Sequence, residues 1–235
     1  MLKYQEVASQ IEAKIIEKDL EQGTKLPSVG ELVTEYQVSK NTILQTLKVL
    51  ESRGFIYQVQ GSGIFVRRKK RIGYLTLLEN QGFSGDLDYA EMQAKVLSVK
   101  VIKAPEEVAN NLHCTTADEV YQIKRVQYIN GQILCVEESY YKKSVVTFMS
   151  KSIAEGSIFQ YLVDGLNIQI GFSDRYLSVH KTKGEISQHL ELPENSPMLL
   201  IEEIYYANNG DPFDFAKNYY HYEHSQFFLQ SNGKI

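Results

Sequence analysis

Residues 23–66 constrain the fold of this chain more than any other segment. They read GTKLPSVGELVTEYQVSKNTILQTLKVLESRGFIYQVQGSGIFV. Helical patterns over Val29–Tyr36 and Lys40–Ser52 are separated by the short turn Gln37–Ser39, and two β-prone runs follow. This order predicts a helix-turn-helix followed by a β-hairpin, or wing. Such an arrangement places one helix in the major groove of DNA and a loop on the flanking backbone.

The second predicted helix has one apolar and one polar face. Ile43, Leu47 and Leu50 lie at spacings of four and three, and Ser39 is a suitable cap before them. Hydrogen-bonding side chains gather at the start of the opposite face, where recognition helices meet base edges. The candidate DNA-binding residues on this helix are Lys40, Asn41, Thr42 and Gln45.

Both ends of the segment offer further contacts to DNA. Pro27 restricts entry to the first helix and Ser28 can cap it, which leaves backbone amides suited to a phosphate. Glycines flank Ser62 at the tip of the wing, so Ser62 and Gly63 are candidate backbone contacts. The alternative is a helical hairpin with a β-arm buried as ordinary core. We favour DNA binding because caps, turn and wing occur in the required order.

The charge distribution supports DNA contact independently. Residues 1–71 hold 12 basic and 8 acidic side chains, a net charge of +4, whereas the remainder holds 13 basic and 21 acidic ones, a net charge of −8. This asymmetry indicates one half that faces nucleic acid. The basic run Arg67–Arg71 is more typical of a solvated linker than of a specific contact, and it can also add salt-sensitive attraction to phosphates.

This segment resembles the winged-helix domain of the GntR family of bacterial transcription factors. The matching positions are Gly23, Leu26, Pro27, Ser28, Glu31, Leu32, Val38, Ser39, Thr42, Leu47, Leu50, Gly54, Gly61, Gly63, Phe65 and Val66. Two positions depart from the pattern: Gly30 and Leu44 stand where the family commonly has arginines that contact DNA. Lys40 keeps a cation where the family has Arg, but without the two-pronged geometry that reads guanine.

Composition limits the remaining possibilities. The 235 residues, 43% hydrophobic, suit one or two domains with real cores. The N-terminus MLKYQEVASQ has no apolar core, and no apolar run approaches the roughly 20 residues that span a bilayer, so we expect no signal peptide and no membrane segment. Cys114 and Cys135 are isolated, which fits a reducing compartment. These features predict a cytoplasmic protein.

The rest of the chain reads as mixed α and β. Strand-like runs occupy 95–103, 119–130, 132–141, 168–181, 198–208 and 213–222, and helical patterns occupy 105–112, 157–164 and 183–190. Asn130-Gly131 joins two strands as a tight hairpin. We therefore expect an α+β fold with three segments: a winged helix-turn-helix domain over residues 1–71, a linker or strand over 72–78, and an antiparallel-sheet domain over 79–235.

This second half resembles the UTRA effector-binding domain of the HutC subfamily of GntR regulators. The resemblance rests on several weak motifs in the right order: GFSGDL at 82–87, APEEVA at 104–109, VYQIKRV at 120–126, VEESYY at 136–141, SIF at 157–159 and PFD at 212–214. It implies a chorismate-lyase-like fold that binds a small effector and forms a homodimer.

The resemblance also implies an effector pocket. Ser84, Arg125 and Ser157 would face an anionic group, Glu137 and Asp214 would accept hydrogen bonds from hydroxyls or an amine, and Tyr220 would flank the ligand. Gln127 and Phe159 stand where relatives have Arg and Tyr, which predicts a ligand less anionic than a sugar phosphate. The alternative is that these charges lie on the strand surface and pair across the sheet.

Together these features predict a ligand-responsive repressor of a carbohydrate or small-metabolite utilisation operon. Its partners would be double-stranded operator DNA, a small-molecule effector such as a sugar or sugar phosphate, and a second copy of the chain. We expect no cofactor, catalytic residue or metal, and interpret His221 and His224 as surface residues although their spacing could bring two imidazoles together. The alternatives are an enzyme with a chorismate-lyase-like fold acting on a small anionic substrate, and a module that has lost operator recognition.

Overall fold

The computed structural model describes residues 2–67, 73–76 and 91–229. The chain divides into two compact units: Met1–Leu78 with Phe227–Ile235, and Glu79–Gln226. Among the described residues, no helix combines the length and apolar character needed to cross a bilayer.

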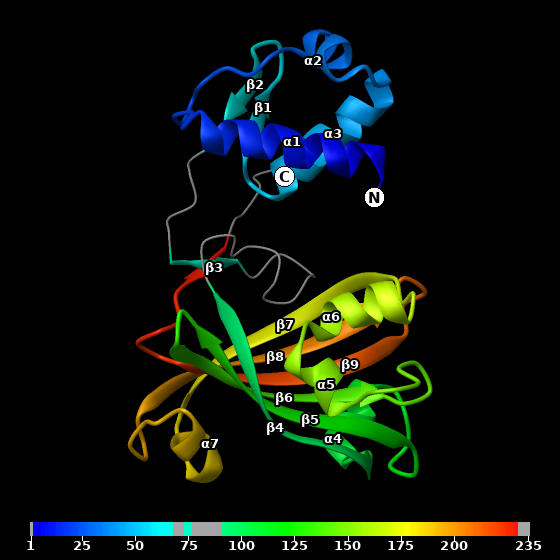
Figure 1. The fold of residues 1–235 in the computed structure, drawn as a ribbon, viewed down its shortest axis with the longest axis vertical. Coiled ribbons are helices and arrows are strands. Elements are labelled where there is room, and N and C mark those ends of the chain that lie inside the picture. Colours follow the sequence, from blue (N-terminus) through cyan, green and yellow to red (C-terminus); the bar gives the residue numbers. More distant parts are fainter. Residues whose placement is uncertain (1, 68–72, 77–90, 230–235) are drawn as a thin grey trace. The chain divides into compact units, whose positions relative to one another are not determined.

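The first unit is a winged helix-turn-helix, as the sequence predicted (Figure 1). Its elements are α1 (Lys3–Glu17), α2 (Val29–Tyr36), α3 (Lys40–Ser52), β1 (Ile56–Val59) and β2 (Gly63–Val66). Ile43, Leu47 and Leu50 of α3 are buried in one core with apolar residues of α1, α2 and the wing. Packing of this apolar stripe leaves the N-terminal polar face of α3 outside the core.

A short pair of strands completes the first unit. β3 (Leu75–Thr76) pairs in parallel with β10 (Phe227–Phe228). The sequence predicts a linker or strand over 72–78. Within the described residues 73–76, the strand covers Leu75 and Thr76. The predicted effector-binding domain runs to residue 235, whereas β10 groups with the N-terminal unit.

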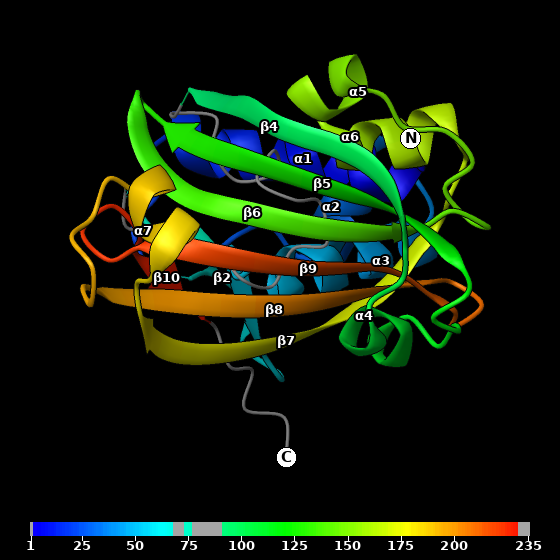
Figure 2. The same cartoon turned by 90° about the horizontal axis from the view of Figure 1, so that it is seen from below.

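The second unit is built on one antiparallel sheet of six strands, in the order β4-β5-β6-β9-β8-β7 (Figure 2). The strands are β4 (Met92–Lys103), β5 (Glu119–Ile129), β6 (Gln132–Lys142), β7 (Ile170–Lys181), β8 (Pro197–Ala207) and β9 (Pro212–His221). Asn130 and Gly131 both have positive φ angles, of 49° and 78°, as the tight turn between β5 and β6 requires. This confirms the expected α+β fold.

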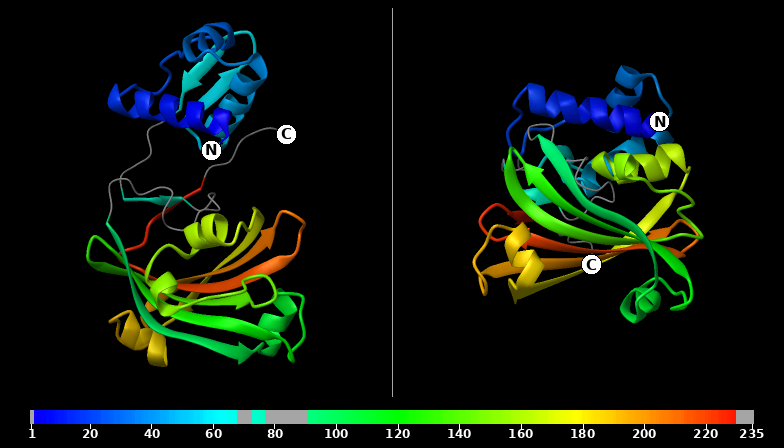
Figure 3. Two further views of the ribbon diagram at one scale, coloured as in Figure 1. Left: turned by 45° about the vertical axis from the view of Figure 1, so that its right-hand side comes forward. Right: turned by 60° about the horizontal axis from the view of Figure 1, so that its bottom comes forward.

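Short helices cover both faces of the sheet (Figure 3). α5 (Lys151–Glu155) and α6 (Ile158–Gln160) pack against Tyr121, Ile123 and Tyr205, and we call this side the α5–α6 face. α4 (Glu106–Asn111) and α7 (Gly184–His189) pack on the opposite face. The expected helix over 157–164 is α6 followed by one π-helical turn over Tyr161–Gly165.

Candidate functional site

The N-terminus of α3 presents three free polar side chains. Lys40, Asn41 and Gln45 are exposed and make no side-chain hydrogen bond with the described residues. The fourth candidate, Thr42, is engaged locally: its amide donates to Ser39 Oγ at 3.1 Å, and the two hydroxyls lie 2.8 Å apart. The cap therefore fixes the start of the helix and leaves Lys40, Asn41 and Gln45 for base edges or phosphates.

Ser28 closes the start of α2 in a capping box with Glu31. The Ser28 amide and hydroxyl each donate to Glu31 Oε2 at 2.7 Å. These bonds to Ser28 lower the pKa of the Glu31 carboxyl. A DNA phosphate at this helix end would have to displace or accommodate that carboxylate, which the sequence alone did not reveal.

The wing brings in a cation that sequence reasoning missed. Gly61 and Gly63 have φ angles of +76° and +127°, which the turn between β1 and β2 requires and which glycine adopts without strain. A Cβ at Gly63 would lie 2.9 Å from Lys25 Cε, so the Lys25 side chain crosses the wing at this point. Ser62 is exposed at the tip. Lys25 is thus placed beside the predicted backbone contacts.

The two positions that lack the usual arginines are open to solvent. A Cβ at Gly30 would meet nothing within 4 Å, and Leu44 is 40% exposed on α3. The absence of arginine there removes possible cationic contacts without changing the packing of the helices.

The effector candidates Arg125, Gln127 and Glu137 form one buried cluster on the α5–α6 face. Arg125 Nη2 donates to both Glu137 oxygens at 2.8 and 2.7 Å, and Gln127 Nε2 donates to Glu137 Oε2 at 2.8 Å. Ser139 Oγ donates to the same carboxylate, and Arg125 Nη1 donates to the Ala154 carbonyl at 2.9 Å. Arg125 and Glu137 do pair across two strands, yet they are 6% and 5% exposed, so they are not surface charges.

A second polar cluster lies on the neighbouring strands of the same face, and the sequence analysis missed it. Glu203 of β8 pairs with Arg175 of β7 and accepts a hydrogen bond from Asn218 Nδ2 at 2.7 Å. Arg175 also donates to the Tyr205 hydroxyl at 3.1 Å. Asn218 and Glu137 are direct cross-strand partners, so the two clusters adjoin.

Asp214 lies on the same face and is 1% exposed. Burial, followed by the nearby Glu137 and Glu203 charges, raises the pKa of its carboxyl well above the usual range. Asp214 Oδ1, Asn218 Oδ1 and Arg125 Nε are buried and have no hydrogen-bond partner among the residues that the structure describes. Buried polar atoms without partners are costly, so these atoms mark a place where a bound molecule could supply the missing partners.

Replacing Asp214 by Asn is expected to stabilise the protein increasingly as pH rises. Because the folded state holds the proton on Asp214 more tightly than the unfolded chain does, folding loses stability above the unfolded pKa of about 4. Asn cannot ionise and escapes this loss. Thermal unfolding at pH 5 and pH 8 should show a larger gain in Tm for Asp214→Asn at pH 8. An equal or smaller gain at pH 8 would contradict the raised pKa.

Of the remaining predicted effector residues, two lie on the α5–α6 face, one caps a helix and one lies outside the described residues. Phe159 packs edge-on against Tyr205, with ring centroids 4.8 Å apart, and so borders the second cluster. Tyr220 is 3% exposed on the same face of β9 as Asp214 and Asn218. Ser157 Oγ accepts the Gln160 amide and caps α6. Ser84 lies outside the described residues.

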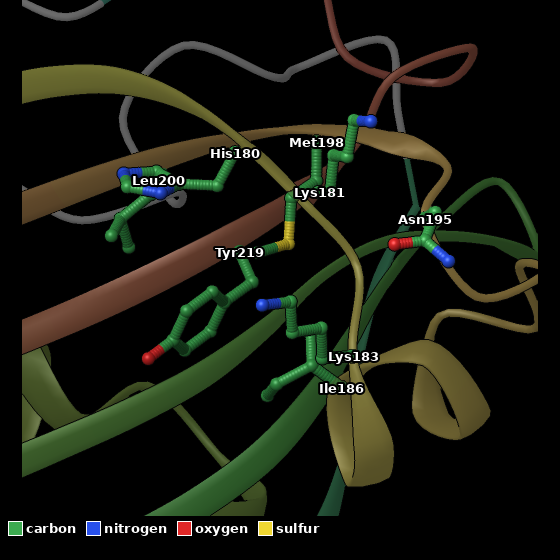
Figure 4. Close-up of a pocket in the computed structure, with 8 residues that line it drawn as sticks. All are labelled: His180, Lys181, Lys183, Ile186, Asn195, Met198, Leu200 and Tyr219. Carbon is green, nitrogen blue, oxygen red and sulfur yellow. The ribbon is translucent and has the colours of Figure 1, made fainter.

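A separate groove of about 410 Å³ lies on the opposite face, beside α7 (Figure 4). It is lined by His180, Lys181, Lys183, Ile186, Asn195, Met198, Leu200 and Tyr219. Burial and neighbouring carboxylates raise the pKa of Tyr219 to about 12. The three basic side chains of this groove are exposed. None of the predicted effector residues that the structure describes lines this groove.

Each of the two units matches a known protein family. Residues 3–66 match the family model described as bacterial regulatory proteins of the gntR family, and residues 89–226 match the UTRA domain. The chain is 48% identical over 232 residues to the uncharacterized HTH-type transcriptional regulator YydK of Bacillus subtilis (strain 168), covering 99% of this chain and 98% of that one. The crystal structure of YydK superposes with a TM-score of 0.88 at 47% identity, covering 99% of this chain and 100% of that one.

More distant relatives carry functional names. The chain is 24% identical to the mannosyl-D-glycerate transport/metabolism system repressor MngR of Escherichia coli (strain K12), covering 98% and 96% of the two chains. It is 26% identical to the HTH-type transcriptional repressor NagR of Bacillus subtilis (strain 168), covering 92% and 89%. The chain therefore belongs to the GntR family of bacterial regulatory proteins, as a transcriptional regulator that joins a DNA-binding winged helix to a UTRA effector-binding domain.

Proposed function

We propose that this protein is a cytoplasmic, homodimeric repressor of an operon for carbohydrate or small-metabolite use. Its effector binds the α5–α6 face of the sheet and releases the protein from its operator. The observation that carries the effector site is that Asp214 Oδ1 and Asn218 Oδ1, beside the Arg125–Glu137 cluster, are buried and find no hydrogen-bond partner within the described part of the chain. The relatives MngR and NagR, both named as repressors, support the direction of regulation.

We infer that the effector is rich in hydrogen-bond donors and carries little negative charge. Arg125 and Arg175 are each paired with a carboxylate on this face, Glu137 and Glu203, so their charges are already compensated. Hydroxyl or amine groups can satisfy the free acceptors, whereas a phosphate would add charge next to the Glu137 and Glu203 carboxylates. Polyols, sugars and amino sugars fit this description.

The regulatory mechanism requires two states with different effector affinities. Two half-sites of an operator need two winged helices, so the active species is a dimer. The effector releases DNA only to the extent that it binds the released state more tightly than the operator-bound state.

Catalysis is the competing function, and we propose that the protein has none. Arg125 and Glu137 are the groups that an anionic substrate would use, and they bind each other. A turnover assay with anionic carbonyl substrates tests this point. Measurable turnover that is lost in Glu137→Gln, while that variant stays folded, would favour the enzyme.

The test of the proposed function is binding of the full-length protein to its own upstream DNA. Fluorescence anisotropy would be measured over a salt series, with neutral sugars, amino sugars, sugar phosphates and amino acids added in turn. We expect tight, sequence-specific binding that a neutral or amine-bearing polyol releases. Release by a sugar phosphate alone would overturn the effector class. Weak binding without sequence preference would overturn operator recognition instead.

A further inference from the structure

The last turn of the second unit gathers two imidazoles and a carboxylate. His221 ends β9, and Glu223 and His224 follow in the turn. The two imidazole rings stack with centroids 3.9 Å apart and planes 8° apart. One ligand atom from each of His221, Glu223 and His224 lies within 4.8 Å of the others. The interpretation of the histidines as surface residues is wrong for His221, which is 5% exposed.

We propose that His221, Glu223 and His224 form a binding site for a divalent cation of the zinc class. Two imidazole nitrogens and one carboxylate oxygen are a ligand set that Zn²⁺, Co²⁺ and Ni²⁺ accept, whereas Mg²⁺ and Ca²⁺ prefer oxygen alone. Two zinc–nitrogen bonds at a tetrahedral angle place their nitrogens about 3.3 Å apart. The rings stack nearly parallel, so their in-plane lone pairs do not converge, and one ring has to turn out of the stack for both nitrogens to face one ion.

The hydrogen bonds around the site prepare His224 and Glu223 for metal binding, whereas His221 has to exchange one. His224 Nδ1 lies 2.8 Å from the Ile133 carbonyl, a pure acceptor, so Nδ1 carries the proton and Nε2 presents its lone pair. His221 Nδ1 accepts the Glu223 amide at 3.3 Å, so Nε2 carries the proton and metal binding through Nε2 requires this long bond to break. The Tyr222 hydroxyl donates to Glu223 Oε1 at 2.9 Å and orients the carboxylate.

The position of this site gives it a structural consequence. Gln226, two residues after His224, is the last residue of the second unit, and Phe227 of β10 follows directly in the first unit. A bound ion would cross-link the end of β9 to this turn and fix the point at which the chain leaves the effector-binding unit. The inference stands on its own geometry and does not depend on the identity of the effector.

Isothermal titration of the metal-free full-length protein with Zn²⁺ and Co²⁺ tests the proposal. We expect saturable binding of a single ion per chain, with the visible absorption of Co²⁺ in nitrogen–oxygen coordination. Mg²⁺ should give no heat. His224→Ala and Glu223→Gln should each weaken binding at least tenfold, because each removes one of three ligands.

The control variant is His113→Asn. His113 is exposed and has a positive φ of 48°, a conformation that Asn tolerates. The substitution should leave the affinity for the metal ion unchanged. If His224→Ala loses its fold, as circular dichroism would show, the exposed Glu223→Gln carries the test. Absence of saturable binding in the wild type, or equal affinity in Glu223→Gln and the wild type, would overturn the site. Neither result would change the outcome expected for operator binding, so the two proposals can fail independently.

Discussion

Replacing Glu137 by Gln is expected to destabilise the second unit by about 3–5 kcal/mol, since breaking a buried ion pair leaves an uncompensated charge. Arg125 would remain buried, having lost the carboxylate that accepts two of its hydrogen bonds. Desolvation is the largest influence on both groups, yet the pKa of Glu137 stays below its usual value because Arg125, Gln127 and Ser139 favour the ionised form. Urea unfolding followed by near-UV circular dichroism measures the loss.

Two further variants test whether the loss of stability comes from the uncompensated buried charge of Arg125. Arg125→Met combined with Glu137→Gln removes both charges, so we expect the double variant to be more stable than Glu137→Gln alone. Glu119→Gln breaks the exposed ion pair with Lys143. The Lys143 and Glu119 side chains are 38% and 46% exposed, so this variant should leave the unfolding midpoint unchanged. Similar losses in Glu119→Gln and Glu137→Gln would contradict the argument from burial.

Asn41→Ala with Gln45→Ala is expected to weaken binding to the specific operator by about thirtyfold or more. A well-placed side chain that reads a base edge contributes about 1–3 kcal/mol, and both amides of α3 are exposed with no partner among the described residues. Affinity for unrelated DNA and its salt dependence should stay nearly constant, because neither side chain is charged. Anisotropy titrations with specific and scrambled duplexes measure the ratio.

Two single variants complete this comparison. Lys40→Ala should weaken binding to every sequence and reduce the salt slope by about one phosphate contact. Gln10→Ala, at an exposed position of α1, should bind as the wild type does. Equal losses on specific and scrambled DNA for the amide pair would remove α3 as the element that reads sequence.

The winged helix was predictable because its signals are local. Ser39, the apolar stripe of α3 and the glycines of the wing each determine the conformation of their immediate neighbours. Strand positions in the second unit were equally readable from period-two patterns and the Asn130-Gly131 turn. Such signals need no knowledge of the rest of the chain.

The second polar cluster was not predictable, because it depends on register between distant strands. Glu203 and Asn218 meet only because β8 and β9 pair in one register, and Arg175 joins them from the edge strand β7. The alternation of Glu203 with Tyr205 was visible in the sequence, but not which face of the strand α5 and α6 would cover. The same reason hid the burial of His221 and the pairing of Leu75 with Phe227.

The parallel pairing of β3 with β10 determines how this protein can be cut into working fragments. The chain passes between the two units twice, after Leu78 and again after Gln226. A fragment of residues 1–78 would lack the Phe227–Phe228 strand that pairs with Leu75–Thr76. An effector-binding fragment should stop at Gln226, because residues beyond it would carry an orphan strand with two exposed ladder edges. The Phe227–Phe228 strand therefore belongs in a DNA-binding fragment, although in the sequence it follows the effector-binding domain.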